Sequence, residues 1–114
     1  MKLSDIQNEF MMDVSVLIQY IQTIKGYKCT GGELYRTMDQ QRIHLRNGKS
    51  TTLRSSHLQR LAIDLNIFIN GRLTYKKEDL QEIGDFWENL RPGKNIWGGN
   101  WKSFIDTPHF ERRK

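Results

Sequence analysis

The chain has 114 residues, of which 37% are hydrophobic and 27% are charged, and its formal net charge is +5 at pH 7. This composition is typical of a folded globular protein and argues against disorder, and the length suits one compact domain over residues 1–114. No apolar run approaches the roughly 20 residues of a membrane span, and the lone Cys29 excludes an internal disulfide. The positive charge favours polyanionic surroundings, although an ordinary solvated basic surface also explains it.

The N-terminal half is typical of a long helix, a strand and a short helix. Apolar residues recur every three or four positions between Ser4, as N-cap, and Gly26, as the stop. The sequence YKCTGGELY then predicts a strand with a bulge or turn near Gly31-Gly32. TMDQQRIHLRNG predicts a short helix that begins near Thr37 or Asp39.

The C-terminal half begins with the clearest strand signal in the chain. From Leu61 to Ile69 the odd positions are all aliphatic, which predicts a strand that turns this face to the core. Asn70-Gly71 favours a tight hairpin turn, and residues 77–90 have the periodicity of a third helix. RPGKNIWGGNW predicts a loop, and PHFER predicts a last extended segment. This order of elements indicates an α+β fold, with helices packed on a small, largely antiparallel sheet.

Three residues of metal-ligating type stand in or near the predicted strands: His57, Asp64 and His109. If the segment with His109 pairs beside the strand with Asp64, the three side chains converge on one face of the sheet. Two imidazoles and one carboxylate, without a thiolate, are typical of a catalytic zinc site rather than a structural one. The spacing alone equally allows a hydrogen-bonded core histidine and an aspartate that binds no metal.

The segments YRTMDQQ, GKSTTLRSSHLQRLAIDL and WGGNWKSFIDTPHFE resemble the zinc peptidases that cut peptidoglycan stem peptides. That family contains D-alanyl-D-alanine carboxypeptidases and phage L-alanyl-D-glutamate peptidases. The resemblance runs from about Gly31 to Glu111, and its pattern is Ser-x-His, then Ala-x-Asp, then a late Asp-x-x-His. The closing segment is closest to the phage and prophage branch. The resemblance implies the small α+β fold that these peptidases share with the signalling domain of hedgehog proteins.

The same resemblance implies a metal centre and a general base. His57, Asp64 and His109 would bind one zinc ion per chain. Asp106, three residues before the last histidine, would be the general base. Glu111 is the rival for this role, since it lies on the same face of an extended strand as His109, where a carboxylate can also support a ligand. The family pattern favours Asp106.

Further residues match family positions around the metal. The resemblance implies that Arg36 steadies the substrate carbonyl and the developing oxyanion. It places Gln40 and Ser55 in supporting roles. We expect Trp97 and Trp101 to line the cleft, or else to cover an edge of the core.

The expected function is therefore a zinc-dependent peptidase of peptidoglycan stem peptides, with the L-Ala–D-Glu endopeptidases of endolysin type as the favoured class. One alternative is a D-Ala-D-Ala carboxypeptidase, in which Arg54 or Arg60 would hold the terminal carboxylate, and another is a non-catalytic zinc-binding recognition domain. Nucleic-acid binding is disfavoured, because the tryptophans cluster with glycines rather than with basic residues. We expect a monomer without stable membrane insertion. The N-terminal sequence lacks a signal-peptide pattern, so we expect synthesis in the cytoplasm and holin-type release to the cell wall.

Overall fold

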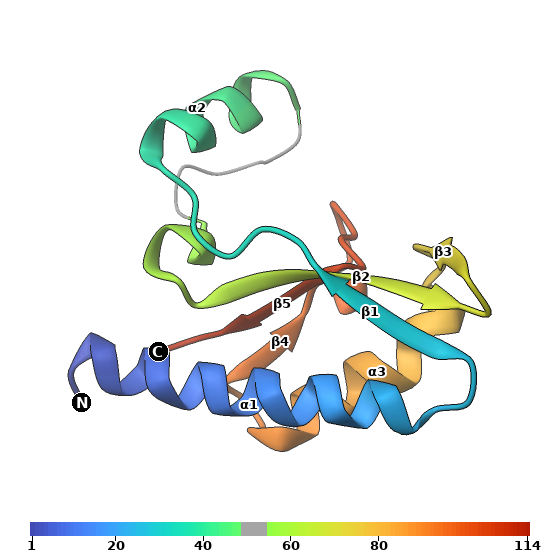
Figure 1. The fold of residues 1–114 in the computed structure, drawn as a ribbon. Helices are drawn as coiled ribbons and strands as arrows, with labels where there is room; N and C mark the ends of the chain where they lie inside the picture. The colour runs from blue at the N-terminus through green and yellow to red at the C-terminus, as the bar shows by residue number, and fades with distance from the viewer. Residues whose placement is uncertain (49–54) are drawn as a thin grey trace.

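The fold combines three α-helices, two short 3-10 helices and five strands in the part of the chain that the structure describes (Figure 1). The structure is a computed structural model that describes residues 1–48 and 55–114. In chain order the elements are α1 Leu3–Thr23, β1 Tyr27–Gly31, α2 Met38–Arg46, η1 Ser56–Gln59, β2 Ala62–Ile69, β3 Arg72–Thr74, α3 Lys77–Leu90, β4 Asn95–Trp97, η2 Gly98–Asn100 and β5 His109–Arg112. None of the described helices has the length and apolar character needed to cross a membrane.

The sheet is built around β2. The strand order is β1-β2-β5-β4, with β3 paired to β2 across the hairpin, and every pair between these strands is antiparallel. Beyond β1 the backbone stays beside β2: Gly32 N donates to Asp64 O at 2.7 Å, and Asp64 N donates to Glu33 O at 2.8 Å. Asp64 therefore has backbone neighbours on both sides. The α+β fold with a largely antiparallel sheet, predicted from the sequence, is confirmed.

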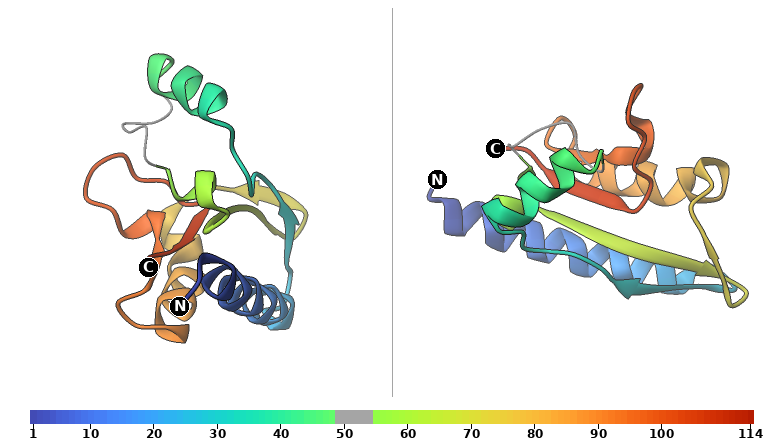
Figure 2. Two further views of the ribbon diagram at one scale, coloured as in Figure 1. Left: turned by 90° about the vertical axis from the view of Figure 1, so that its left-hand side faces the viewer. Right: turned by 90° about the horizontal axis from the view of Figure 1, so that it is seen from above.

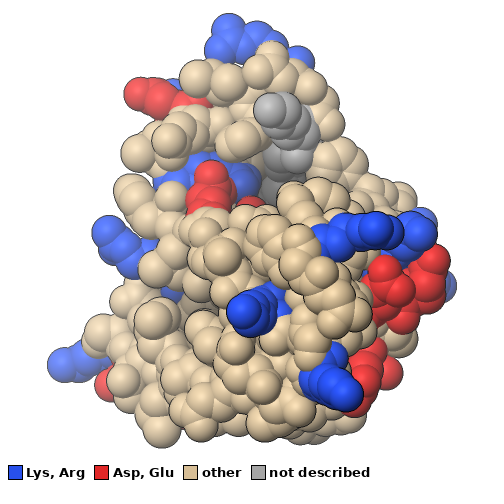
Figure 3. Space-filling model, turned by 45° about the vertical axis from the view of Figure 1, so that its right-hand side comes forward, with Lys and Arg blue, Asp and Glu red and all other residues tan. Residues whose placement is uncertain are grey.

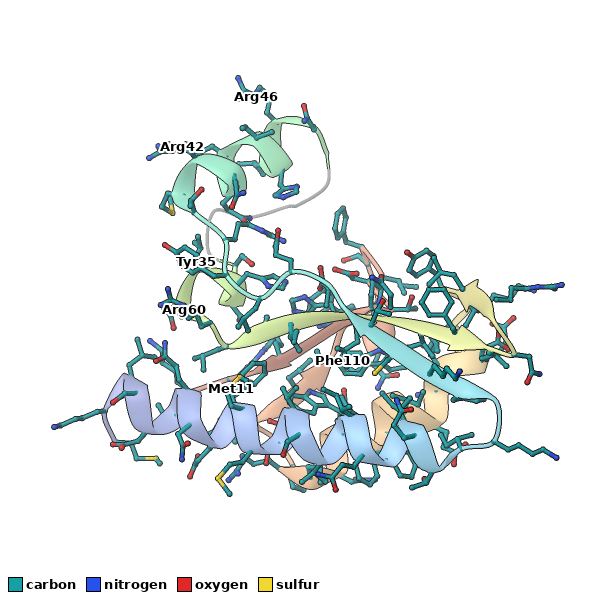
Figure 4. The ribbon with its side chains drawn as sticks, in the orientation of Figure 1. Met11, Tyr35, Arg42, Arg46, Arg60 and Phe110 are labelled. Carbon is teal, nitrogen blue, oxygen red and sulfur yellow. The ribbon has the colours of Figure 1, made fainter. Side chains whose placement is uncertain are left out.

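Helices α1 and α3 cover one face of the sheet, whereas α2 stands on the opposite side, apart from them (Figures 1 and 2). The ring of Trp87 on α3 packs edge-on against Phe10 of α1 and Phe110 of β5, with centroids 5.8 and 6.0 Å apart. Figure 4 shows Phe110 between the sheet and the helices. Because successive residues of a strand point to opposite faces, His109 lies on the face away from this core.

The predicted boundaries hold for α3 and fail by a few residues for α1. Helix α1 begins one residue before Ser4 and ends at Thr23, so Ser4 is a helical residue and not the N-cap. Gly26 follows in the connecting turn with φ +83°, a conformation that glycine adopts without strain. Thr37 is the N-cap of α2, as one of the two predicted starts required. The first part of the predicted polar loop, residues 49–54, lies outside the described residues.

The segment predicted as a loop after α3 contains a strand, β4, that pairs with β5. Its formation depends on Trp97, whose side chain is fully buried in the core and whose indole Nε1 donates to Thr107 O at 2.8 Å. The indole of Trp87 donates to Ile96 O and Glu111 O, which binds both strands to α3. Trp97 is thus a core residue and does not line the cleft.

Gly84 on α3 allows the close approach of Trp97. A β-carbon added at Gly84 would fall onto the Trp97 ring. We expect Gly84→Ala to lower the free energy of unfolding by about 1–3 kcal/mol, the usual cost of overpacking a core, despite the gain in helix propensity. Urea unfolding measures this loss. Gly31→Ala is the control, since no described heavy atom lies within 4 Å of its β-carbon position; equal stability of the two variants would contradict the prediction.

Candidate metal centre

The three predicted ligands converge on the face of the sheet opposite the helical core. His57 lies in η1, Asp64 in β2 and His109 in β5. Asp64 and His109 are direct partners in the antiparallel register of β2 and β5. One ligand atom from each of the three residues lies within 4.8 Å of the others. The strand pairing that the sequence analysis made a condition for convergence is therefore present.

Hydrogen bonds fix which nitrogen of each histidine faces the centre. His57 Nδ1 lies 3.0 Å from Leu34 O, and a carbonyl only accepts, so Nδ1 carries the proton and Nε2 faces Asp64 Oδ1 at 3.4 Å. His109 Nε2 donates to Glu111 Oε1 at 2.7 Å, which leaves Nδ1 directed at Asp64 Oδ1 at 3.7 Å. Both rings thus turn one nitrogen inward and have the other held by an acceptor, as histidine ligands of metals do.

The polar atoms at the centre fit a bound cation. His57 Nε2 and Asp64 Oδ1 are buried and have no hydrogen-bond partner among the described residues. Leaving such groups buried without a partner costs about 1–3 kcal/mol each, and a divalent ion would satisfy both. Two imidazoles and one carboxylate match the donor set of catalytic zinc, with coordination positions left for water or substrate. The residues present therefore fit zinc.

The charges of the cluster shift the pKa values of its members in opposite directions. Burial alone would raise the pKa of Asp64, but the close imidazoles of His109 and His57 favour its charged form and lower the pKa to about 2. Burial alone would lower the pKa of His109, but the close carboxylate of Asp64, the hydrogen bond to Glu111 and the other nearby carboxylate charges raise it to about 9. In the metal-free protein at neutral pH, these shifts favour a protonated His109, whose positive charge lies beside the negative charge of Asp64.

These shifts predict the pH dependence of stability in metal-free protein. The contribution of His109 is complete below its ordinary pKa of 6.5 and is lost as the pH rises through about 9. The contribution of Asp64 is present above 3.8 and is lost as the pH falls through about 2. Urea unfolding with a chelator present should show a decline in stability between pH 6.5 and 9. His109→Gln should reduce this decline, and an equal slope in both proteins would contradict the assignment.

Asp106 lies at the edge of the centre, in the loop before β5. Its Oδ2 is 4.0 Å from His109 Nδ1, too far for a hydrogen bond and outside the group of three ligands. Burial raises the pKa of Asp106, partly offset by the charge of His109. Gly98 holds the loop in place: Asp106 N donates to Gly98 O at 3.1 Å, and a β-carbon at Gly98 would collide with the carbonyl of Asp106. Asp106 is thus near the ligands and free to meet a water molecule.

Glu111, the rival carboxylate, is bound on the far side of His109. Its two oxygens accept from His109 Nε2 at 2.7 Å and from Arg113 Nε at 3.1 Å. Its exposed fraction is 6%, and the interaction with His109 keeps its pKa low against the opposing effect of burial. This geometry favours support of the ligand ring over proton transfer at the open side of the centre.

Arg36 lies beside the centre but is extensively hydrogen-bonded. Its Nε donates to Glu33 Oε1 at 2.5 Å, and its Nη2 pairs with the same oxygen. Its Nη1 donates to Gln41 Oε1 at 2.5 Å and lies 3.4 Å from Ser55 Oγ. Ser55 is also the N-cap of η1, where its hydroxyl accepts from His57 N at 3.2 Å. Ser55 therefore lies next to His57 and links it to Arg36.

The structure separates the two adjacent glutamines. Gln40 is exposed, and its side-chain oxygen accepts from Thr37 N at 3.0 Å to complete the N-terminal capping box of α2. Gln41 is fully buried and contacts Arg36. The glutamine near the site is thus Gln41, which the sequence analysis missed. The spacing Thr37-x-x-Gln40 carried the signal, because this pattern engages Gln40 in the cap.

One aromatic residue, Trp101, borders the centre, whereas another, Tyr35, packs against Arg60. The ring of Trp101 lies 5.0 Å from that of His109, so Trp101 lines the site as expected. The guanidinium of Arg60 lies over the Tyr35 ring at 4.4 Å. Figure 4 shows Tyr35 and Arg60 beside the segment that connects β1 to α2. Arg42 and Arg46 on α2 point away from the body of the molecule.

The fold and the site together define a small α+β domain with a His-Asp-His cluster that could hold a metal ion, on the face of its sheet opposite α1 and α3. The family model described as D-alanyl-D-alanine carboxypeptidase matches residues 48–112, which is more than half of the chain. The chain belongs to this family of peptidases. The family resemblance stated from the sequence is therefore confirmed.

The chain is similar to two L-alanyl-D-glutamate peptidases. An L-alanyl-D-glutamate peptidase of Listeria phage A118 is 29% identical over 79 residues, which cover 69% of this chain and 28% of the relative. The chain thus spans less than a third of the length of that phage protein. The crystal structure of the L-Ala D-Glu endopeptidase ChiX of Serratia marcescens superposes with a TM-score of 0.76 at 27% identity, covering 93% of this chain and 79% of that one.

Proposed function

We propose that the protein is a zinc-dependent peptidase that cleaves the stem peptides of peptidoglycan between L-alanine and D-glutamate, as endolysins do. The observation that carries this proposal is the cluster of His57 Nε2, Asp64 Oδ1 and His109 Nδ1, with a second carboxylate, Asp106, beside it. A zinc ion bound there would polarise the scissile carbonyl and lower the pKa of water toward about 7. A domain that only binds zinc would need neither Asp106 nor Arg36.

The residues of the chain divide the remaining work. The Asp106 carboxylate would accept a proton from the attacking water and pass it to the leaving amine, and its raised pKa suits this exchange. The guanidinium of Arg36 would stabilise negative charge on the carbonyl oxygen, since its contacts to Glu33 and Gln41 hold it in one orientation. Trp101 would shield the ring of His109 from solvent.

The choice of bond rests on the relatives. The phage protein and ChiX are both named for the L-Ala–D-Glu bond, whereas the family model is described as a carboxypeptidase. A carboxypeptidase must also bind a free terminal carboxylate. Of the two cations suggested for this purpose, Arg60 is engaged with the Tyr35 ring, and Arg54 lies outside the described residues. The endopeptidase is therefore the favoured reading.

Digestion of purified peptidoglycan tests the proposal. Mass spectrometry and end-group labelling should detect new N-terminal D-glutamate, without new reducing sugar ends. Release of free D-alanine alone would replace the endopeptidase by the carboxypeptidase of the same family. An intact stem peptide after incubation with zinc-loaded protein would favour the non-catalytic recognition domain.

A further inference from the structure

The segment from Glu33 to Arg36 holds two of the three ligand residues through its backbone. Glu33 O accepts from Asp64 N at 2.8 Å, and Leu34 O accepts from His57 Nδ1 at 3.0 Å. Arg36 N donates in return to His57 O at 3.3 Å. A displacement of this short segment would therefore move His57 and Asp64 relative to each other.

The side chain of Glu33 lies between this backbone and the catalytic side chains. Its Oε1 accepts from Arg36 Nε and also pairs with Nη2, so one carboxylate oxygen is shared by two guanidinium nitrogens in a charge-assisted contact. The same oxygen lies 3.8 Å from His57 Nδ1, and Oε2 lies 4.0 Å from His44 Nε2. On the face shown in Figure 3, basic and acidic groups lie side by side just below the top of the molecule.

The Arg36 side chain is only 12% exposed, so the charge of Glu33 decides where it rests. A guanidinium removed from water needs an anionic partner, and its loss leaves an uncompensated charge that reorients or draws in water. Through Nη1 the same guanidinium reaches Gln41 on α2 and Ser55 at the start of η1. Glu33 thus supplies the negative charge for the Arg36 guanidinium, which connects the Glu33–Arg36 segment to α2 and to the start of η1.

We propose that Glu33 is a positioning residue of the peptidase. Its carboxylate orients Arg36 toward the substrate carbonyl, and its charge near His57 Nδ1 favours the tautomer with the proton on Nδ1, which turns the Nε2 lone pair inward. This role rests on the proposed function for Arg36, but its effect on His57 concerns zinc binding alone. Glu33 thereby couples the orientation of the His57 ring to the orientation of the Arg36 guanidinium.

The test compares Glu33→Gln with the control Asp39→Asn. Asp39 pairs with Arg42 in an exposed part of α2, so this variant changes charge by the same amount away from the centre. Competition with a chromophoric chelator should show zinc binding weaker by about 10-fold in Glu33→Gln and unchanged in Asp39→Asn. This is the lower end of the usual cost of losing a hydrogen-bond partner of a metal ligand, because Glu33 Oε1 lies 3.8 Å from His57 Nδ1 and acts on it by charge alone. The kcat for a stem peptide should fall more than KM changes. Wild-type zinc affinity together with wild-type kcat in Glu33→Gln would overturn the proposal.

A double-mutant cycle separates positioning from general stabilisation. If Glu33 acts on catalysis through Arg36, adding Glu33→Gln to Arg36→Gln should lower kcat little further, whereas additive losses would show independent roles. Should Glu33→Gln fail to fold, Glu33→Asp keeps the charge but withdraws the carboxylate, and it should also lose zinc affinity and kcat; wild-type values there would refute positioning. The zinc measurement needs no substrate, so it decides the role of Glu33 at His57 even if the wild-type protein cleaves no wall peptide.

Discussion

Replacing His57 by alanine is expected to abolish zinc binding and peptidase activity together. The variant keeps only Asp64 and His109, and it also loses the hydrogen bond from Nδ1 to Leu34 O. A metal ion contributes several kcal/mol of transition-state stabilisation, so activity should fall by about a thousand-fold or more. Elemental analysis should find close to one zinc per chain in the wild-type protein and far less in the variant.

Two further variants show whether the loss of zinc is specific to the proposed ligands. His109→Ala should lose the metal in the same way, because its Nδ1 is the third inward-facing donor. His44→Ala should keep one zinc per chain, because His44 lies on α2 and belongs to no group of potential ligands that the described residues form. Full zinc occupancy in His57→Ala and His109→Ala would remove this site from consideration.

Asp106→Asn is expected to retain the metal and lose nearly all activity. Asp106 stands 4.0 Å from His109 Nδ1 and is not one of the three ligands, so its amide variant leaves the donor set intact. A general base typically contributes about 100- to 10,000-fold to the rate. Steady-state kinetics on a stem peptide, at zinc concentrations that saturate both proteins, should show a loss of kcat in this range.

Glu111→Gln provides the contrast. Because Glu111 holds the outer nitrogen of His109, its loss should weaken zinc binding by about 10- to 100-fold and leave most of kcat when zinc is in excess. An active Asp106→Asn enzyme beside a zinc-loaded but inactive Glu111→Gln enzyme would mean that the base is Glu111.

The sequence predicted those parts of the fold whose signals are local. The alternation from Leu61 to Ile69 and the Asn70-Gly71 turn determine β2 and its hairpin within a dozen residues, and α3 has the periodicity of an amphipathic helix. The convergence of His57, Asp64 and His109 needed one further assumption, that the last segment pairs with β2. The structure fulfils this assumption, because β5 pairs with β2 and His109 lies opposite Asp64.

The parts that could not be predicted depend on contacts between distant residues. β4 has three residues in a segment rich in glycine, and it is a strand because Trp97 is buried against Gly84 and β5. The position of Gln41 beside Arg36 depends on how α2 is oriented, which a helical pattern does not reveal. Glu33 carried no signal in the sequence, since its importance comes from contacts made by Arg36 and His57.

The pairing of β2 with β5 has a consequence for the order in which the protein is made. His57 and Asp64 are synthesised before His109. The cluster of three is therefore incomplete until the strand His109–Arg112 has been made and pairs with β2. A chain that lacks this strand also lacks one of the three members of the proposed metal centre. In the proposed function, zinc binding therefore follows the pairing of β5 with β2, which couples metal uptake to folding.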